Sequence, residues 1–492
     1  MDYQVFLEIF IYILLIVGYS IVTLSLTLVT LSFFNRARYR IRNYVFDDDI
    51  RPQISVVAPA HNEAEVIERT IKKFIETHYP SDKKELIIVN DGSDDDTEKI
   101  VRKYAYKIID SETGLATYKD QIQPLPLDKN IVLVNRKIGG LGKAQVLNDA
   151  KKYAKGELLF CIDADIQINK DALLRAVRHF ADERVGAVIG YISIVDRGDA
   201  LTGFINFEFS IGQKIQRVGY DTLGIHYIIP GGCGIFRKSL FKTLGDYSSE
   251  TLAEDTDMSF RLLTKTNKKV HFDPSIQVVA DEPIQLMSLW NQRVRWARGN
   301  IEVTKKNIGF FGKPKYGKGL TIGYPFWLAS VIMPLGFALT TAGFLIMNLF
   351  DISMEPFLFV SRIIAGMFIG AIAYTIISNK GKYWLQGIIS PGFPILITML
   401  SAIIWADGIQ GLMETVEYPE YTHAVILALL SWLIIPIALT SPVIRMSKKF
   451  PRLANFIQLV LFGYWSVLIV SGIYAHYKEL VGGERVWIKT VR

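Results

Sequence analysis

Residues 53–91 read QISVVAPAHNEAEVIERTIKKFIETHYPSDKKELIIVND and decide the class of fold. Two short runs rich in β-branched residues, at 53–59 and 85–90, flank a stretch at 63–78 whose apolar residues have helical spacing. This pattern predicts a strand, a helix and a second strand, the unit that joins neighbouring parallel strands. Both strands are nearly continuous apolar runs, which indicates a sheet covered by helices on both faces.

The same alternation continues beyond residue 91 and predicts an α/β domain with a mostly parallel sheet. The segment 111–128 is polar and contains Pro124 and Pro126, so we expect it to be an excursion over the surface. The other expected elements are helices at 94–107, 142–154 and 171–180, and strands at 130–135 and 157–162.

Apolar stretches on both sides of this domain predict a membrane protein. Half of the 492 residues are hydrophobic, which is too apolar for an ordinary soluble enzyme. The run at 6–34 is long enough to cross a bilayer as a helix, which needs about 20 residues. Pro391 and Pro394 mark one later stretch as the first candidate that does not cross. The five later stretches are 323–349, 357–378, 385–406, 424–444 and 454–476.

The charge distribution sets the expected orientation. The chain has a formal net charge of +7, and its basic clusters lie beside apolar stretches. The positive-inside rule then places the polar domain in the cytoplasm and the chain in the cell membrane, as a multi-pass protein in contact with membrane lipids. No stripe of Lys and Arg alternates with aromatic residues, so nucleic acid is not an expected partner. Cys161 and Cys233 indicate neither a disulfide framework nor a zinc site.

These patterns divide the chain into parts. We expect an N-terminal transmembrane helix at 1–35, a cytoplasmic domain at 36–302, an interfacial segment at 303–322, about five membrane helices at 323–477 and a basic tail at 478–492.

Polar residues follow the predicted strands at the edge where ligands collect in parallel sheets. They are Asn62-Glu63, Asp91-Gly92 and Asp163-x-Asp165. Each is common alone, as turn chemistry or as a helix cap. Asp163 and Asp165 point the same way from an extended chain, and their carboxylates can bind a divalent cation that neutralises a nucleoside diphosphate. The sequence therefore predicts a site for Mg²⁺ or Mn²⁺ there.

The glycine-rich stretch Gly139-Gly140-Leu141-Gly142-Lys143 opens a predicted helix. Its backbone amides can hold phosphate, with Lys143 as the counter-charge. The spacing is not that of a Walker A loop, so ATP hydrolysis is not indicated.

Two further motifs complete a recognisable series: Ala253-Glu254-Asp255 and Gln292-Arg293-Val294-Arg295-Trp296. With the motifs above, in this order, the chain resembles the processive-type family-2 inverting glycosyltransferases, the family of cellulose, chitin, hyaluronan and poly-N-acetylglucosamine synthases. The residues 290–300 are most similar to poly-N-acetylglucosamine and chitin-oligosaccharide synthases. The resemblance implies a GT-A-like α/β domain that binds a nucleotide-sugar, joined to an α-helical transmembrane region.

The resemblance implies a set of donor-binding residues. Asn62, Glu63 and Asp91 would hold the uracil and ribose of a UDP-sugar. Asp163 would contact the nucleotide, and Asp165, with Asp163 beside it, would bind Mg²⁺ or Mn²⁺ at the diphosphate. The remaining donor-binding residues would be Lys143, Gln292, Arg295 and Trp296.

The resemblance also implies how the acceptor is held. Asp255 would be the catalytic general base that takes the proton from the acceptor hydroxyl. Many relatives have Thr where this chain has Ala253, so we expect activity with altered local hydrogen bonding. The acceptor-binding residues would be Gly232, Cys233, Glu254 and Trp296.

The expected function is inverting transfer from a UDP-sugar, with UDP-N-acetylglucosamine as the favoured candidate, to a growing β-linked polysaccharide at the cytoplasmic membrane face. The spans would form an export channel, with accessory export partners. Two alternatives stay open. One is transfer of a single sugar to a polyprenyl-phosphate or other lipid-linked acceptor, which product length would separate. The other is a non-catalytic, transporter-like membrane protein, which would not turn over the donor.

Overall fold

The computed structural model describes residues 47–118, 130–310, 324–336, 372–389 and 464–484, together with isolated positions elsewhere. Its strands are β1 (Ile54–Ala60), β2 (Lys84–Asp91), β3 (Lys107–Asp110), β4 (Ala116–Tyr118), β5 (Ile131–Arg136), β6 (Leu158–Cys161), β7 (Gln167–Ile168), β8 (Val185–Ile194), β9 (Gly234–Arg237) and β10 (Lys269–Ala280).

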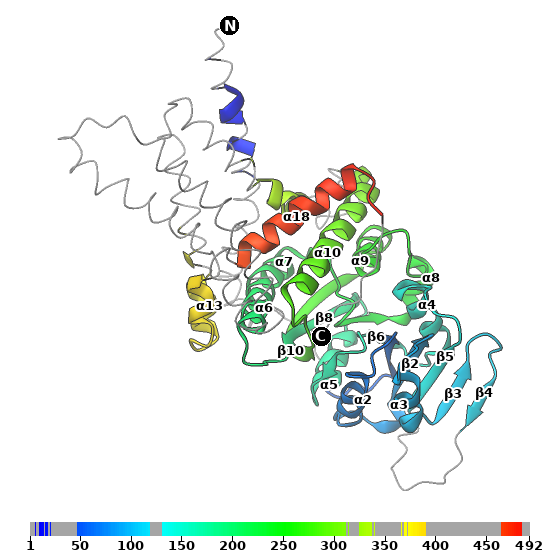
Figure 1. Cartoon of the computed structure of the whole chain (residues 1–492). Helices are drawn as coiled ribbons and strands as arrows, with labels where there is room; N and C mark the ends of the chain where they lie inside the picture. Colours follow the sequence, from blue (N-terminus) through cyan, green and yellow to red (C-terminus); the bar gives the residue numbers. More distant parts are fainter. Residues whose placement is uncertain are drawn as a thin grey trace.

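The strands form one ten-stranded sheet with the order β4-β3-β5-β2-β1-β6-β9-β8-β10-β7 (Figure 1). β1 pairs in parallel with β2, as the opening stretch predicts, and also with β6. β9 runs antiparallel to both of its neighbours, β6 and β8. The sheet is therefore mixed but mostly parallel, and the carboxyl ends of β1, β2 and β6 meet at one edge.

Helices cover both faces of this sheet. The described helices are α2 (Ile67–Ile75), α3 (Thr97–Tyr104), α4 (Lys143–Tyr153), α5 (Ala172–Val177), α6 (Ala200–Ile211), α7 (Val218–Leu223), α8 (Phe241–Leu244), α9 (Glu254–Lys265), α10 (Leu286–Asn307), α13 (Trp384–Ile389) and α18 (Tyr464–Leu480). Of these, α13 packs on α6 and α18 packs on α10. Successive strand residues point to opposite faces. Val56 therefore packs in the core beneath α2, α3 and α5, and Val57 packs in the core beneath α4, α8 and α9.

The structure differs from the sequence prediction in two neighbouring segments, 94–107 and 111–128. The helix expected at 94–107 ends at Tyr104, and the next residues form β3, because Ile108 and Ile109 favour a strand. The segment 111–128 was expected to be only a surface excursion, yet β4 lies within it and pairs with β3. All three residues of β4 are exposed, so the apolar pattern of a buried strand is missing there.

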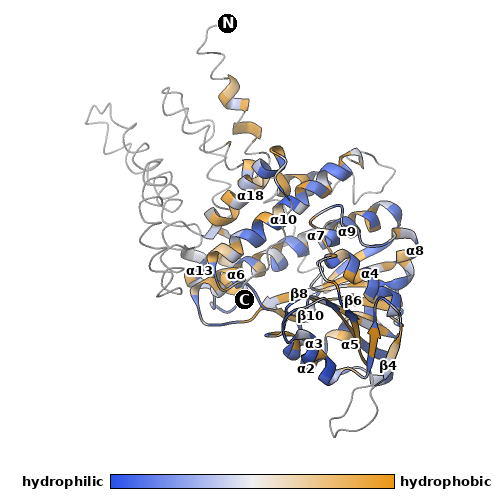
Figure 2. Cartoon of the chain, turned by 45° about the vertical axis from the view of Figure 1, so that its right-hand side comes forward, coloured by the Kyte–Doolittle hydropathy of each residue, from blue (hydrophilic) through white to orange (hydrophobic). Residues whose placement is uncertain are grey.

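Within the parts of the chain that the structure describes, no helix is both long enough and apolar enough to cross a bilayer. The expected spans at 6–34, 357–378, 385–406 and 424–444 lie largely or wholly outside the described residues. The described pieces near the N-terminus are almost entirely hydrophobic, whereas α10 and α18 mix hydrophobic and hydrophilic residues (Figure 2). α10 continues to Asn307, past the domain boundary expected at residue 302.

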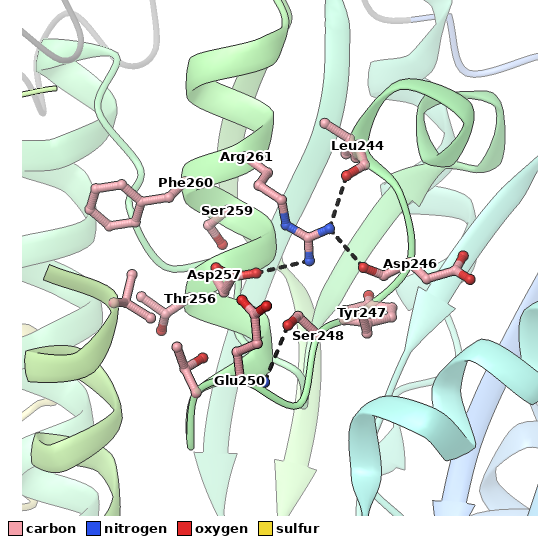
Figure 3. A network of polar contacts seen from close by, with 12 residues as sticks. Leu244, Asp246, Tyr247, Ser248, Glu250, Thr256, Asp257, Ser259, Phe260 and Arg261 are labelled. Carbon is pink, nitrogen blue, oxygen red and sulfur yellow. Dashed lines mark hydrogen bonds and ion pairs between the residues drawn. The ribbon is translucent and has the colours of Figure 1, made fainter. Parts of the chain in front are cut away.

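A polar network fixes the beginning of α9 (Figure 3). Asp257 is almost completely buried, and its carboxylate pairs with Arg261 at 2.9 Å and with Lys306 of α10 at 2.9 Å. Arg261 also donates to the carbonyls of Leu244 at 2.9 Å and Asp246 at 2.7 Å. The network therefore ties α9 both to α10 and to the loop that leads into α9.

Asp257→Ala is expected to lower the free energy of unfolding by about 3 kcal/mol, because it leaves two cations facing a site that has lost its charge. Glu250→Ala is the matched control, since Glu250 pairs with the same Lys306 at 2.6 Å but its side chain is 72% exposed. That change should cost less than about 1 kcal/mol. Denaturant unfolding of the purified chain measures both, and equal losses would contradict the role given to Asp257.

Candidate active site

The loop after β1 is held against the loop after β2. Asn62 has a φ of +57°, a left-handed conformation that Asn adopts more readily than most residues. Its backbone N–H donates to the Ser93 hydroxyl at 2.9 Å, and its side-chain oxygen accepts from the backbone of Asp94 at 2.9 Å. The backbone N–H of Glu63 donates to the Thr97 hydroxyl at 2.7 Å. Asn62 and Glu63 are thereby fixed at the carboxyl edge of the sheet.

Asp91 ends β2 at this same edge and is only 6% exposed. Its carboxylate lies 3.3 Å from Nε of Arg136, the last residue of β5, and accepts from the Gly140 backbone at 3.4 Å. A Cβ on Gly139 would lie 2.3 Å from the carbonyl oxygen of Asp91. The glycine-rich stretch therefore packs directly against the end of β2. Arg136 was not among the predicted site residues. Its only signal in the sequence is its position directly after the strand predicted at 130–135.

Lys143 begins α4 and brings distant acidic residues together. Its Nζ lies 2.5 Å from Oδ1 of Asp163, after β6, and 3.4 Å from Oε1 of Glu254, at the start of α9. The backbone N–H of Gly231 donates to Oδ2 of Asp255 at 3.0 Å, and a Cβ on Gly231 would lie 2.8 Å from Nζ of Lys143. We call Lys143, Asp163, Glu254 and Asp255 the charge cluster.

Electrostatics link the four members of the charge cluster. Burial by itself lowers the pKa of Lys143, but the charges of Asp163, Glu254 and Asp255 outweigh it and raise that pKa above its usual value. Burial raises the pKa of Glu254, and the charge of Asp255 raises it further, while Lys143 and Arg295 act in the opposite direction. Lys143 therefore stays charged, and Arg295 lies within electrostatic range of the cluster.

Asp255 is oriented by its position at the first turn of α9. Its Oδ1 accepts from the backbone N–H of Thr256 at 2.7 Å, while Oδ2 accepts from Gly231. Helix α10 approaches this turn closely, since a Cβ on Gly299 would lie 2.7 Å from the Cβ of Ala253. Unpaired N–H groups at a helix start stabilise a carboxylate.

The three predicted residues of α10 have different surroundings. Gln292 donates to Glu282 at 2.9 Å, and the ring of Trp296 lies 4.4 Å from the guanidinium carbon of Arg293. Arg295 acts on the charge cluster through its charge on Glu254. The charge of Arg295 therefore reaches the charge cluster, whereas Gln292 contacts Glu282 and Trp296 contacts Arg293.

The remaining predicted residues lie beside Asp163. A Cβ on Gly232 would lie 3.4 Å from Oδ2 of Asp163, so Gly232 lets the backbone approach the carboxylate. Asp165, two residues after Asp163 in the chain, is buried and only 4% exposed. Cys233 was expected to contact the acceptor, but its side chain is fully buried in the sheet core beside Gly190. That expectation is wrong for this conformation, because the thiol reaches no open surface.

Asp163 and Asp165 offer the oxygen donors that a hard divalent cation prefers. Among the described residues, no group of three or more His, Cys, Asp or Glu side chains is placed to hold a metal ion. The two carboxylates supply oxygen donors of the right kind but too few for a complete site, so a cation held there would take its other ligands from phosphate or water.

Comparisons with known proteins agree on one family. The model of glycosyl transferase family 2 matches residues 55–245, and that of glycosyl transferase family group 2 matches residues 158–378. A probable glycosyltransferase of Bacillus subtilis, YdaM, is 30% identical over 306 residues, which is 62% of this chain and 68% of the relative. A poly-β-1,6-N-acetyl-D-glucosamine synthase of Staphylococcus epidermidis is 28% identical over 334 residues, 66% of this chain and 73% of the relative.

Among solved structures, a mannosyltransferase of Pyrobaculum calidifontis in complex with GDP-Man and Mn²⁺ superimposes with a TM-score of 0.51. It is 22% identical, and the match covers 76% of this chain and 97% of that one. The likeness supports the GT-A-like class of fold.

Lys143→Met tests the charge cluster through the pH dependence of stability. Without the ammonium, the pKa of Glu254, which burial and the charge of Asp255 already raise, should rise further above its unfolded value. Stability is then lost as pH increases through the raised pKa, by about 1.4 kcal/mol for each pH unit that separates the folded pKa from the unfolded one. The variant's deficit in unfolding free energy should therefore be small at about pH 5 and larger at about pH 8.

Lys152→Met is the matched control for this experiment. Lys152 lies on the same helix and pairs with Asp149 at 2.8 Å, but its side chain is 62% exposed. Its deficit should stay small at both pH values. A Lys143→Met deficit that does not change with pH would show that the cluster carboxyls do not depend on Lys143.

Proposed function

Because the chain belongs to glycosyl transferase family 2, we propose that it transfers N-acetylglucosamine from UDP-N-acetylglucosamine to a growing β-linked polysaccharide. The chain is a glycosyltransferase of the processive type. The observation that carries the finer proposal is the charge cluster, which places Lys143, Asp163 and Asp255 together at the ligand-binding edge of the sheet. The curated relatives named poly-β-1,6-N-acetyl-D-glucosamine synthases support this choice of sugar.

Asp255 is the proposed general base. Direct displacement at the anomeric carbon inverts its configuration and requires a carboxylate that removes the proton of the acceptor hydroxyl. The two backbone hydrogen bonds to Asp255 use one lone pair on each carboxylate oxygen and hold the side chain still. The Thr256 hydroxyl also donates to Oδ1 at 3.3 Å, so the proposed partner of the acceptor hydroxyl is the second lone pair of Oδ2.

Positive charge is the second requirement, because the leaving group is a nucleoside diphosphate. Lys143 is charged and Arg295 acts on the same cluster, so both are proposed to stabilise the departing diphosphate. Asn62, Glu63 and Asp91 are proposed to hold the uracil and ribose, since they lie at the same edge of the sheet. A divalent cation on Asp163 and Asp165 would supply further neutralisation.

The location of the reaction is also part of the proposal. The apolar stretches and their basic flanks support a multi-pass protein of the cell membrane whose catalytic domain faces the cytoplasm. The polymer would leave through the membrane region, with accessory export partners. Acceptor identity is read from product length, because transfer to a polyprenyl-phosphate or other lipid-linked acceptor would stop after one sugar.

Asp255→Asn should reduce incorporation of radiolabelled N-acetylglucosamine by roughly 10²–10⁴-fold, because the amide cannot accept the proton. The measurement is incorporation into polymer by the purified chain in lipid. Glu250→Gln is the control, since Glu250 is an exposed carboxylate close to the same helix, and it should transfer at the normal rate. Normal incorporation by Asp255→Asn would refute the assignment of the base.

Removal of divalent cations with EDTA should abolish incorporation, and Mn²⁺ or Mg²⁺ should restore it. Asp165→Asn should raise the metal concentration needed for half-maximal activity by at least about tenfold, since one anionic ligand is lost. Titration of Mn²⁺ against the initial rate measures this value for both chains. Full activity of the wild-type chain in EDTA would contradict the metal site.

A further inference from the structure

Arg293, the second residue of the Gln-x-x-Arg-Trp motif, has no role in the function proposed above. It is nevertheless buried and makes polar and aromatic contacts with several elements. Its side chain is 6% exposed, and its guanidinium lies 2.7 Å from the carboxylate of Glu208 on α6. It also donates to Oε1 of Gln292 at 2.8 Å and lies 4.4 Å from the ring centre of Trp296. One side chain thus contacts two of the three motif residues.

The same guanidinium connects the motif to a segment far along the chain. The hydroxyl of Tyr464, the first residue of α18, lies 3.5 Å from Arg293 and donates to Glu208. The Tyr464 ring is fully buried and stacks on Phe204 of α6, with ring centres 5.6 Å apart. Helices α6, α10 and α18 therefore meet at Arg293, and α10 and α18 lie side by side (Figure 1).

The charge and shape of Arg293 suit this position. Burial alone lowers the pKa of Arg293, but Glu208 outweighs it and raises the pKa, so the cation persists. Trp296 follows Arg293 by three residues and so lies on the same face of the helix, while Gln292 is reached by a direct side-chain hydrogen bond. A guanidinium can donate in several directions and stack on an indole at once, which the point charge of a lysine cannot do.

We propose that Arg293 is a positioning residue, which holds Gln292 and Trp296 in place for sugar transfer and makes their placement depend on α18. This inference rests on the function proposed above and on the expected roles of Gln292 and Trp296 as donor-binding residues, with Trp296 also at the acceptor. The anchor of Arg293 on Glu208 and Tyr464 fixes the side chain, and the side chain in turn fixes the two motif residues.

A second arginine of α10 provides a matched comparison. Arg298 is 9% exposed and also binds α18, through Glu479 at 2.8 Å, and the residues just after that helix, through the carbonyls of Gly483 and Glu484 at 2.7 Å each. It has similar burial and the same kind of anchor as Arg293, but its contacts lie at the other end of α18. Loss of either guanidinium weakens the contact between the two helices, but only loss of Arg293 frees Gln292 and Trp296.

The test compares Arg293→Lys with Arg298→Lys in the purified full chain, using UDP-N-acetylglucosamine as donor. Arg293→Lys should lower kcat by roughly 10- to 100-fold, with the donor KM changed less than about threefold, because misplaced groups slow the chemical step. Arg298→Lys should keep kcat within about twofold of the wild-type value, even if its unfolding midpoint falls as much as that of Arg293→Lys. Tyr464→Phe, which removes a single hydroxyl, should give an intermediate loss of kcat. Equal losses of kcat in the two lysine variants would overturn the proposal.

A second readout does not depend on activity. Hydrogen–deuterium exchange should rise in the peptide that covers residues 286–297 in Arg293→Lys, and stay unchanged there in Arg298→Lys. Unchanged exchange in both variants would overturn the positioning role. If the wild-type chain incorporates no sugar while the two lysine variants still differ in exchange as expected, the proposed function is refuted and the positioning contact stands.

Discussion

The ammonium of Lys143 is the constraint on which the rest of the site depends. Three carboxylates, from Asp163, Glu254 and Asp255, lie around it at the ligand-binding edge of the sheet. Carboxylates at such distances repel one another, and burial strengthens that repulsion. The first turn of α9 can therefore rest beside the end of β6 only while a cation lies between them. Lys143 also begins α4, so the position of that helix and the charge balance of the site are set together.

Close approach of backbones is the second condition, and glycine meets it at two decisive points. Gly231 lets its own N–H reach Asp255 while Lys143 lies where a side chain would be. Gly299 lets α10 rest against the residue that precedes Glu254. These contacts join α4, α9 and α10 at one place. The ion pairs of Asp257 behind them hold α9 at that distance, so the acidic pair at its start has little freedom to move away.

Patterns that are local in the sequence predicted the fold well, and long-range contacts account for what they missed. The strand–helix–strand unit at 53–91 and the GT-A-like class follow from the order of apolar runs and motifs. The antiparallel β9 could not be predicted this way, because its direction depends on a loop return after α7. Cys233 was assigned to the acceptor through the family resemblance, but its side chain packs in the core of the sheet. Arg136 was missed because its carboxylate partners are not local in the sequence, and Arg293 because its anchors, Glu208 and Tyr464, lie far away in the chain.

The net charge of the charge cluster explains why a nucleoside diphosphate needs positive charge from another source. Lys143, Arg295 and Arg217, whose pKa burial lowers and the charge of Asp255 raises, together only offset the three carboxylates, so the cluster has no spare positive charge for a diphosphate. A diphosphate adds at least two negative charges, and Asp165 adds another nearby. The divalent cation proposed at Asp163 and Asp165 would supply the remaining positive charge, which gives the pair of aspartates at the end of β6 a physical role.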